Sequence, residues 1–115
     1  MRRLPSSKSL RETSVSAPLF AALGDRTRLQ LVSRLCSRGP ASIASLSAGL
    51  PITRQAITKH LRAMERSGLV RSRRHGRQTI WRLERRRLRQ ARQYLEAISA
   101  QWDSALARLR DFVEN

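Results

Sequence analysis

The stretch from Ser42 to Leu83 constrains the fold of this chain most strongly. Apolar residues recur at helical spacing through its first half and are interrupted once, at residues 49–51 (GLP), which predicts two short helices around a tight turn. Gly68 ends the second helix, and residues 69–83 then have the composition of two strands that turn at His75-Gly76. Helices followed by a hairpin in this order can place one helix in the major groove of DNA and an arm on the flanking backbone.

The positive charge of the chain is concentrated in one block. The sequence has 24 basic and 8 acidic residues, a formal net charge of +16. Residues 54–92 have 14 basic and 2 acidic side chains, a net charge of +12, whereas residues 93–115 have 2 and 4, a net charge of −2. A general preference for arginine over lysine does not explain this difference. The asymmetry is typical of a protein with a face that binds a polyanion.

Length and cysteine content limit the class of protein further. A chain of 115 residues predicts one domain with a small core. Cys36 is the only cysteine, so an intramolecular disulfide is excluded and a cytoplasmic protein is expected. The sequence lacks a run of about 18 apolar residues, so we expect no membrane partner. Residues 1–16 lack the apolar segment of a signal peptide and predict a flexible basic tail, which either has no role or adds a contact to DNA.

Two helices are expected before the helix-turn-helix. Residues 18–24 (PLFAALG) predict a short apolar helix with proline in its first turn. Asp25 is placed to cap a helix at residues 26–37, which ends before Gly39-Pro40. One face of this helix is predicted to pack in the core, namely Leu29, Val32, Leu35 and Cys36. We interpret Cys36 as a small packed side chain rather than as a redox-active or metal-binding thiol.

The helix predicted at residues 54–67, with Thr53 as its N-cap, has two different faces. At about 100° per residue, its apolar side chains Ile57, Leu61 and Met64 fall within about 60° of one another. A polar set falls roughly opposite, namely Gln55, Thr58, Lys59, Arg62 and Arg66. Glutamine pairs well with adenine and arginine with guanine, and threonine can contact a base edge or a methyl group. Because a basic hairpin follows, we predict that this polar face contacts DNA and does not merely face solvent.

The hairpin predicted at residues 69–83 combines an apolar base with a charged tip. Leu69, Trp81 and Leu83 are expected to pack on the helices, because a hairpin with this much charge is not stable alone. Its basic side chains then point outward, where they can neutralise phosphates. The candidate DNA-binding residues of this wing are Arg71, Arg73, Arg74, His75 and Arg77.

One long helix without glycine or proline is predicted from Arg85 onward. Apolar residues recur along it at alternating spacings of three and four, the a and d pattern of a coiled coil, namely Leu88, Ala91, Leu95, Ile98, Trp102, Ala105, Leu109 and Phe112. A core of this size has little room to cover such a stripe. We therefore predict that the same helix of a second subunit packs against it, although packing within one subunit remains an alternative and the two can share the stripe.

Several segments resemble the ArsR/SmtB family of bacterial winged-helix transcriptional repressors, namely FAALGDRTR at 20–28, ITKHL at 57–61, SGLV at 67–70, and Gly76-Arg77 leading to WRL at 81–83. The resemblance covers roughly residues 18–113. It implies a mainly α-helical fold with a small β-hairpin wing, in which four helices are followed by two strands and a long helix. Residues 17–115 would form the winged helix-turn-helix domain, and two copies would dimerise through their first helices and through the last helix at about 85–114.

The resemblance also assigns roles to residues of the predicted DNA-binding helix. It implies that seven residues of this helix and its N-cap contact double-stranded DNA, namely Thr53, Arg54, Gln55, Thr58, Lys59, His60 and Arg62. His60 lies at the edge of the apolar face, so its position suits packing or a phosphate contact as well as a base contact.

The chain departs from the metal-sensing members of that family. Some of those members resemble one another in a Cys pair near the helix that corresponds to residues 42–48 of this chain. Others bind metal through Asp and His residues of the last helix. This chain has no cysteine at the first position, and its only histidines, His60 and His75, lie outside the last helix. Carboxylates of that helix such as Asp103 and Glu114, without a histidine partner, do not make a zinc ligand set. The resemblance therefore implies the metal-independent branch, without a metal or other cofactor, whose members often repress a small operon that includes their own gene.

The sequence thus favours a dimeric, sequence-specific repressor that binds an inverted-repeat operator in the bacterial cytoplasm. The alternative is a basic protein that binds nucleic acid without sequence preference, for example one associated with RNA, the ribosome or the nucleoid. The long heptad helix favours the repressor, because a nonspecific binder needs charge but no fixed half-site spacing. An enzyme is not expected, since the sequence offers no nucleophile–base pair, metal cluster or phosphate-binding glycine loop.

Overall fold

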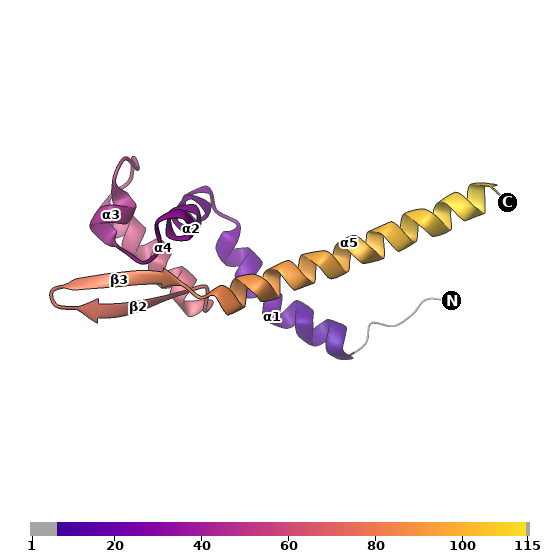
Figure 1. Cartoon of the computed structure of the whole chain (residues 1–115), viewed down its shortest axis with the longest axis horizontal. Coiled ribbons are helices and arrows are strands. Elements are labelled where there is room, and N and C mark those ends of the chain that lie inside the picture. The colour runs from indigo at the N-terminus through magenta and orange to yellow at the C-terminus, as the bar shows by residue number, and fades with distance from the viewer. Residues whose placement is uncertain (1–6, 115) are drawn as a thin grey trace.

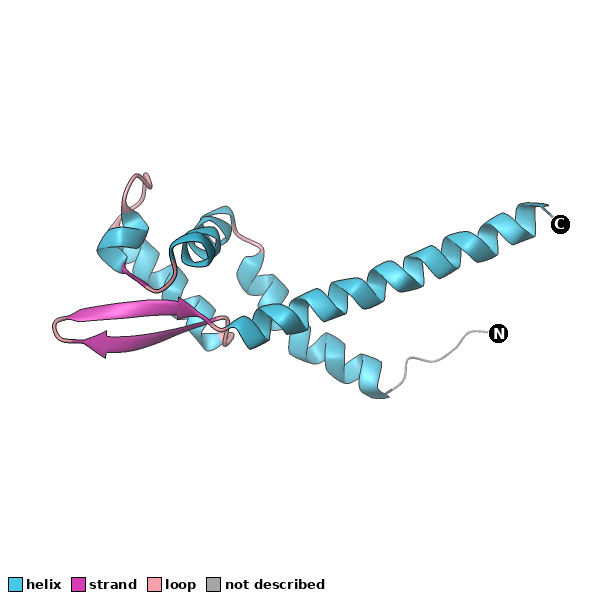
Figure 2. Cartoon of the chain, viewed as in Figure 1, coloured by secondary structure: helices cyan, strands magenta, loops and turns pink. Residues whose placement is uncertain are grey.

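Five helices and a small antiparallel sheet make up the computed structural model, which describes the backbone of residues 7–114 and all of their side chains except those of 7–10 and 12 (Figures 1 and 2). In chain order the elements are α1 (Ser7–Leu23), α2 (Arg26–Arg38), β1 (Ala41–Ser42), α3 (Ile43–Ser47), α4 (Arg54–Arg66), β2 (Val70–His75), β3 (Gln78–Leu83) and α5 (Arg85–Glu114). The prediction of a mainly α-helical winged helix-turn-helix is confirmed.

Short polar side chains begin three of the helices, because the first N–H groups of a helix have no partner within it. The Asp25 carboxylate accepts from the Arg28 N–H at 3.0 Å and caps α2. Ser42 accepts from the Ser45 N–H and begins α3, while Thr53 accepts from the Ala56 N–H at 3.1 Å and begins α4. The caps predicted at residues 25 and 53 are therefore confirmed.

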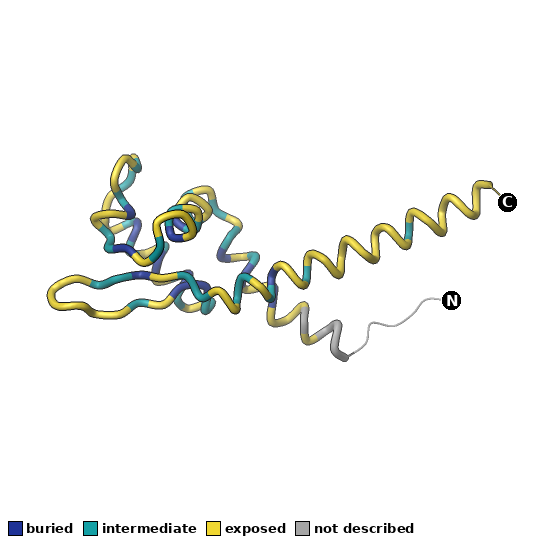
Figure 3. The backbone as a smooth tube through the Cα atoms, viewed as in Figure 1, coloured by how far each residue is buried: buried dark blue, intermediate teal, exposed yellow. Residues whose placement is uncertain are grey.

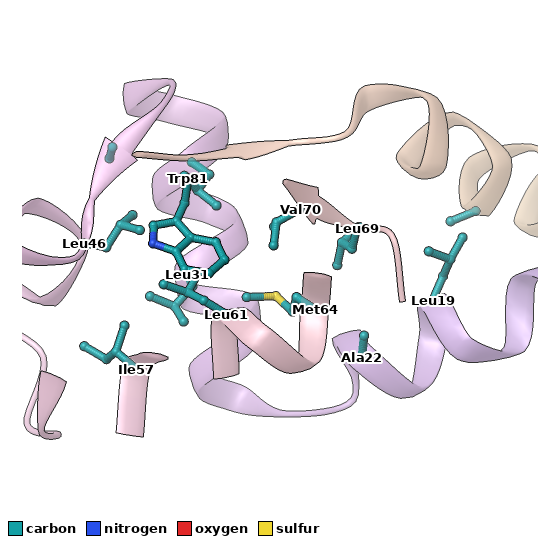
Figure 4. Packing of buried hydrophobic residues seen from close by; sticks show 13 residues of the cluster. Leu19, Ala22, Leu31, Leu46, Ile57, Leu61, Met64, Leu69, Val70 and Trp81 are labelled. Atoms are coloured by element: carbon teal, nitrogen blue, oxygen red, sulfur yellow. The ribbon is translucent and has the colours of Figure 1, made fainter. Parts of the chain in front are cut away.

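The core lies where α4 meets α2, α3 and the sheet (Figure 4). Ile57, Leu61 and Met64 of α4 are fully buried, as the sequence predicted. Their largest partner is Trp81 of β3, and the cluster also contains Leu19, Ala22, Leu31, Leu35, Ala41, Leu46, Leu69, Val70 and Ala91. Because α4 buries one face against this cluster, its opposite face is turned outward.

The sheet has one strand more than predicted. β1 pairs antiparallel with β3, through Ala41 with Trp81 and Ser42 with Ile80, so that the strand order is β1-β3-β2. A strand of two residues is too short to produce an alternating pattern, so periodicity could not predict it. The hairpin turn also lies one residue later than predicted, because His75 still pairs with Gln78 and the turn is Gly76-Arg77. Gly76 has φ +64, a conformation that favours glycine.

The predicted boundary of the N-terminal helix is wrong. α1 begins at Ser7 rather than at Pro18, so residues 7–16 are helical and not a flexible tail, and Pro18 lies inside the helix. Packing explains the difference, because tertiary contacts stabilise helices whose own propensity is modest. Ser16 and Leu19 are buried, and Phe20 packs against Tyr94 of α5 with ring centroids 5.8 Å apart. The predicted tail residues 1–6 lie outside the described residues.

The buried face of α2 also differs from the prediction. Leu31 and Leu35 are buried, and Val32 is half-buried, but Leu29 and Cys36 are exposed. Leu31 and Leu35 are one helical turn apart and point into the core together. The buried stripe of α2 is rotated away from the predicted one, so the interpretation of Cys36 as a packed side chain is wrong.

α5 leaves the rest of the molecule soon after it begins (Figures 1 and 3). Its first turns pack on the core through Ala91, which is buried, and Leu88, which is half-buried. The helix has 30 residues, about 45 Å at 1.5 Å per residue, so most of its length projects beyond the core. No helix in the described part of the chain is long and apolar enough to cross a membrane.

Candidate nucleic-acid interface

The outward face of α4 presents most of the polar side chains predicted to contact DNA. Thr53, Arg54, Gln55, Lys59 and Arg62 are exposed, while Thr58 and His60 are half-buried. Within the described residues, the side chains of Arg54, Gln55 and Lys59 form no hydrogen bond or ion pair. Their donors and acceptors are therefore available to a ligand that approaches this face.

Two residues of the predicted set are already engaged inside the protein. The Thr58 hydroxyl donates to the Arg54 carbonyl at 2.9 Å, which leaves its methyl group and its lone pairs for other contacts. His60 Nδ1 accepts from Arg28 Nε at 3.1 Å and lies 3.9 Å from the Asp25 carboxylate. The hydrogen bond from the Arg28 N–H lowers the pKa of Asp25, so this carboxylate remains charged beside Arg28 and His60. His60 thus links α4 to α2.

Arg62 is held on the side of α4 that faces the wing. Its Nη1 lies 3.0 Å from Glu65 Oε1, and its guanidinium lies 5.0 Å from the centroid of the Trp81 ring. Glu65 also accepts a hydrogen bond from the Ser72 hydroxyl, which, more than its pairing with Arg62, lowers the pKa of the carboxyl group. Glu65 was not among the residues predicted from the sequence. The spacing of three residues between Arg62 and Glu65, which favours ion pairs in helices, was the signal that could have found it.

The wing carries a second group of exposed cations. Arg73, Arg74, His75 and Arg77 are exposed and have no side-chain partner within the described residues. Arg71 differs, because its Nε donates to Glu84 Oε2 at 2.8 Å near the base of the hairpin. Arg82, near the base, is also exposed and unpaired within the described residues, but most of the unpaired basic side chains lie toward the tip, as suits a surface that binds phosphates.

The apolar series of α5 divides into two parts. Leu88 and Ala91 belong to the core of the same subunit, and Ala105 is half-buried. The remaining members of the predicted dimer interface are exposed, namely Leu95, Ile98, Trp102, Leu109 and Phe112, and Val113 and Leu106 beside them are exposed as well. Trp102 is 64% exposed and Phe112 82% exposed, values that are unusual for side chains of this size in a folded monomer.

A groove lies between α1 and α5, next to this stripe. It has a volume of about 380 Å³ and is lined by Arg11, Val15, Ser16, Gln90, Gln93, Tyr94 and Ala97. Among the side chains that the structure describes, no three His, Cys, Asp or Glu residues come together as a metal site would need. The described surface therefore presents two features that face outward, a basic one on α4 and the wing and an apolar one along α5.

Residues 23–73 match the family model described as a helix-turn-helix domain. The HTH-type transcriptional regulator YuzN of Bacillus subtilis is 40% identical over 68 residues, which cover 54% of this chain and 74% of that protein. The HTH-type transcriptional regulator Rv2034 of Mycobacterium tuberculosis is 34% identical over 65 residues, which cover 56% of this chain and 60% of that protein.

Solved structures are similar over more of the chain. An ArsR-like transcriptional regulator from Rhodococcus sp. RHA1 has a TM-score of 0.74 and 39% identity, covering 86% of this chain and 92% of that one. A second structure, of an ArsR family transcriptional regulator, has a TM-score of 0.70 and 28% identity, covering 77% of this chain and 97% of that one.

Fold, surface and similarities together define a winged helix-turn-helix regulator of transcription that binds DNA, and not an enzyme. The chain belongs to the ArsR family of such regulators.

Proposed function

We propose that this regulator is a homodimeric repressor that binds an inverted-repeat operator in the bacterial cytoplasm. The proposal rests above all on the apolar stripe of α5, which a single subunit leaves exposed from Leu95 to Val113. A protein that only spreads positive charge over nucleic acid needs no such stripe. A dimer that holds two DNA-binding helices at a fixed distance does need one. Control of the operon that contains its own gene is part of the same proposal.

The proposed base contacts come from α4 of each subunit. The Gln55 amide can form two hydrogen bonds to adenine, and the guanidinium of Arg54 can bind guanine or a phosphate. The free ammonium of Lys59 suits a phosphate. Because the Thr58 hydroxyl already donates to the Arg54 carbonyl, the methyl group of Thr58 is the part of that side chain that best suits a contact with a thymine methyl. Thr53 and His60 complete the proposed contact surface at its two edges, and Arg62 is considered separately below.

The proposed phosphate contacts come from the wing. Arg71, Arg73, Arg74, His75 and Arg77 are exposed, and all but Arg71 are unpaired within the described residues, so they can neutralise phosphates at little cost in broken contacts. Contacts of this kind hold the protein on the duplex but carry no sequence information. Sequence preference is therefore assigned to α4 and most of the salt dependence to the wing.

The proposed dimer interface is the α5 stripe together with the adjoining groove between α1 and α5. Single exposed apolar side chains are ordinary, but a contiguous row of large ones marks an interface. A spacing of three and four residues lets two helices interdigitate such side chains. The winged-helix domain would then comprise all of α1 in addition to the predicted residues 17–115, with α5 as its dimerisation helix.

The test is to select DNA fragments with the purified protein and to sequence them. An inverted repeat with half-sites about one helical turn apart is expected, together with a dimer in analytical ultracentrifugation at micromolar concentration. With six to ten phosphate contacts, affinity should fall by about 10³ to 10⁵ between 50 and 200 mM salt. Equal affinity for selected and scrambled DNA at physiological salt would instead favour the nonspecific nucleic-acid-binding protein.

The role of α4 has its own test. Gln55→Ala should cost about 1–3 kcal/mol on the selected operator and relax the preference at one base pair. Lys59→Ala serves as the matched control on the same helix, because loss of a phosphate contact weakens all sequences alike. A Gln55→Ala protein with unchanged preference would remove this residue from the proposed base contacts.

A further inference from the structure

Arg62 makes two contacts that both point toward the wing rather than away from the protein. Its Nη1 lies 3.0 Å from Glu65 Oε1, one turn further along α4, and its guanidinium lies over the ring of Trp81 on β3 at 5.0 Å from the centroid. A cation over an aromatic face and an ion pair each fix the direction of a long side chain. The Arg62 side chain thus bridges α4 and β3.

Glu65 connects α4 to the other strand of the wing, β2. Its Oε2 accepts from the Ser72 hydroxyl on β2 at 2.5 Å, while Oε1 faces Arg62. Ser72 and Trp81 are directly opposite each other in the register of the hairpin. Three side-chain contacts and the backbone pairing of Ser72 with Trp81 therefore form a closed loop from α4 to β2, across to β3, and back to α4.

Trp81 depends on this loop for its orientation. The ring is fully buried, but its Nε1–H has no hydrogen-bond acceptor within the described part of the chain. Packing and the Arg62 guanidinium are therefore the contacts that set the angle of the indole. Because the indole N–H has no partner, no hydrogen bond adds to these two contacts, and a shift of Arg62 changes the contact on one face of the ring.

The tip of the wing lies beyond this point and would amplify a change in angle. Three further residue pairs separate Trp81–Ser72 from the turn, namely Arg73 with Ile80, Arg74 with Thr79, and His75 with Gln78. At about 3.3 Å per residue, the turn lies roughly 13 Å past the Trp81 pair. A small rotation of the hairpin at Trp81 thus displaces the cationic tip relative to α4.

We infer that Arg62 and Glu65 are positioning residues that fix the wing relative to α4, so that the base contacts and the phosphate contacts reach the same stretch of DNA together. The inference rests on the proposed function, because it assigns Arg62 to the alignment of the two DNA-binding elements. It also changes the role expected from the sequence, in which Arg62 was grouped with residues that contact DNA directly.

Glu65→Gln tests the inference through the sign of its effect. The amide keeps an acceptor for Ser72 but cannot pair with the Arg62 guanidinium as a carboxylate does. Simple electrostatics predicts tighter binding to DNA, because one negative charge is removed from a protein that binds a polyanion. Positioning predicts the opposite, namely about three- to tenfold weaker binding to the operator and to variant operators alike, with the same order of preference.

Two further variants and two controls make the test specific. Ser72→Ala breaks the loop without changing charge and should weaken binding in the same direction, and both it and Glu65→Gln should reduce the salt dependence because wing cations leave their phosphates. Asp103→Asn removes a negative charge on α5, far from the loop, and should not weaken binding. Arg66→Ala removes an exposed arginine of the same helix that has no partner within the described residues, and should not disturb Trp81.

A measurement without DNA separates this inference from the proposed function. In a Trp102→Phe background, Trp81 is the only tryptophan, and Glu65→Gln and Ser72→Ala should both change its fluorescence while Arg66→Ala does not. Unchanged fluorescence, or binding by Glu65→Gln as tight as wild type or tighter, would overturn the inference. So would an Arg62→Lys protein that alters preference at one base pair only, since that result identifies a base contact. Wild-type protein that binds no selected operator would overturn the proposed function instead, while the fluorescence still reports on the loop.

Discussion

The body formed by α1 to α4 and the wing differs sharply from the outer half of α5 in how its apolar side chains are used (Figure 3). In the body, Ile57, Leu61 and Met64 recur at helical spacing and are fully buried against Trp81. In α5, Leu95 and Trp102 recur at the same kind of spacing and are exposed. The same sequence pattern therefore leads to a closed core in one region and to an open stripe in the other.

Periodicity therefore identifies which face of a helix is apolar but not what covers that face. α4 has α2, α3 and the sheet around it, whereas α5 has left these elements after about two turns. Burial of a large apolar side chain contributes about 1.5–3 kcal/mol of free energy. A row of exposed apolar side chains can therefore stabilise a complex with a partner that covers them. We expect the body to be stable by itself and the outer half of α5 to gain its stability from a second subunit.

The largest expected effect is on the dimer. Trp102→Asp should weaken dimerisation at least 100-fold, because it buries an unpaired charge in the proposed seam, and operator affinity should fall with it. The body should stay folded, since Trp102 is 64% exposed and touches no part of the core cluster. Sedimentation and circular dichroism on the same samples measure the two properties separately.

Ser104→Asp is the matched control for this variant. Ser104 is exposed and lies about 200° around α5 from Trp102, so the same charge there faces away from the stripe. A wild-type protein that sediments as a stable monomer, or an aspartate at 102 that leaves the dimer intact, would break the comparison between the two regions.

The second effect is on the body. Leu61→Ala should cost about 2–5 kcal/mol of unfolding free energy, because the side chain is fully buried and leaves a cavity beside Trp81. Leu109→Ala, the same change in the outer half of α5, should leave the stability of the body unchanged and weaken only the dimer. Denaturant unfolding of each variant in a Trp102→Asp background would isolate the body, and equal losses at both positions would contradict a separate core.

The parts of the molecule that the sequence predicted are those that local signals specify. Caps at Asp25 and Thr53, the buried face of α4 and the two wing strands each follow from side-chain chemistry within a few residues. The exposed positions of Arg54, Gln55 and Lys59 follow in turn, because the face opposite a buried stripe must point outward.

The parts that the sequence did not predict depend on contacts between distant residues. The helical conformation of residues 7–16 depends on packing near Tyr94, which is 81 residues from Thr13, and β1 exists only because β3 is beside it. Arg62 was predicted on the polar face of α4, but its contact with Trp81, and the hydrogen bond from Ser72 to its ion-pair partner Glu65, depend on the folded wing. Helical spacing alone also predicted Cys36 in the core. Cys36 follows the buried Leu35 directly, and the turn of about 100° between neighbouring residues of a helix is enough to bring its side chain to the surface.

A smaller effect is expected from the tip of the wing. Arg74→Ala should weaken binding to the operator and to scrambled DNA by a similar factor and lower the slope of log affinity against log salt by about 1, because one phosphate contact is lost. Stability should not change, since Arg74 has no partner within the described residues. If Arg74→Ala changed the preferred bases instead, the division of roles between α4 and the wing would be reversed.

The smallest effect is expected at Cys36 and from metal ions. Because the Cys36 side chain is exposed, Cys36→Ser should change unfolding free energy by no more than about 0.5 kcal/mol and leave operator binding unchanged. A transition-metal site needs several nitrogen, sulfur or oxygen donors that converge on one ion, and this chain offers a single thiol with its two imidazoles on α4 and at the end of β2. Zinc, cadmium, nickel and arsenite are therefore expected to leave operator affinity unchanged within about threefold, as measured by titration of operator DNA with and without each ion. Release of the DNA by a stoichiometric metal would mean that two α5 helices form a metal site together. The outer half of α5 would then bind a regulatory metal in addition to forming the dimer interface.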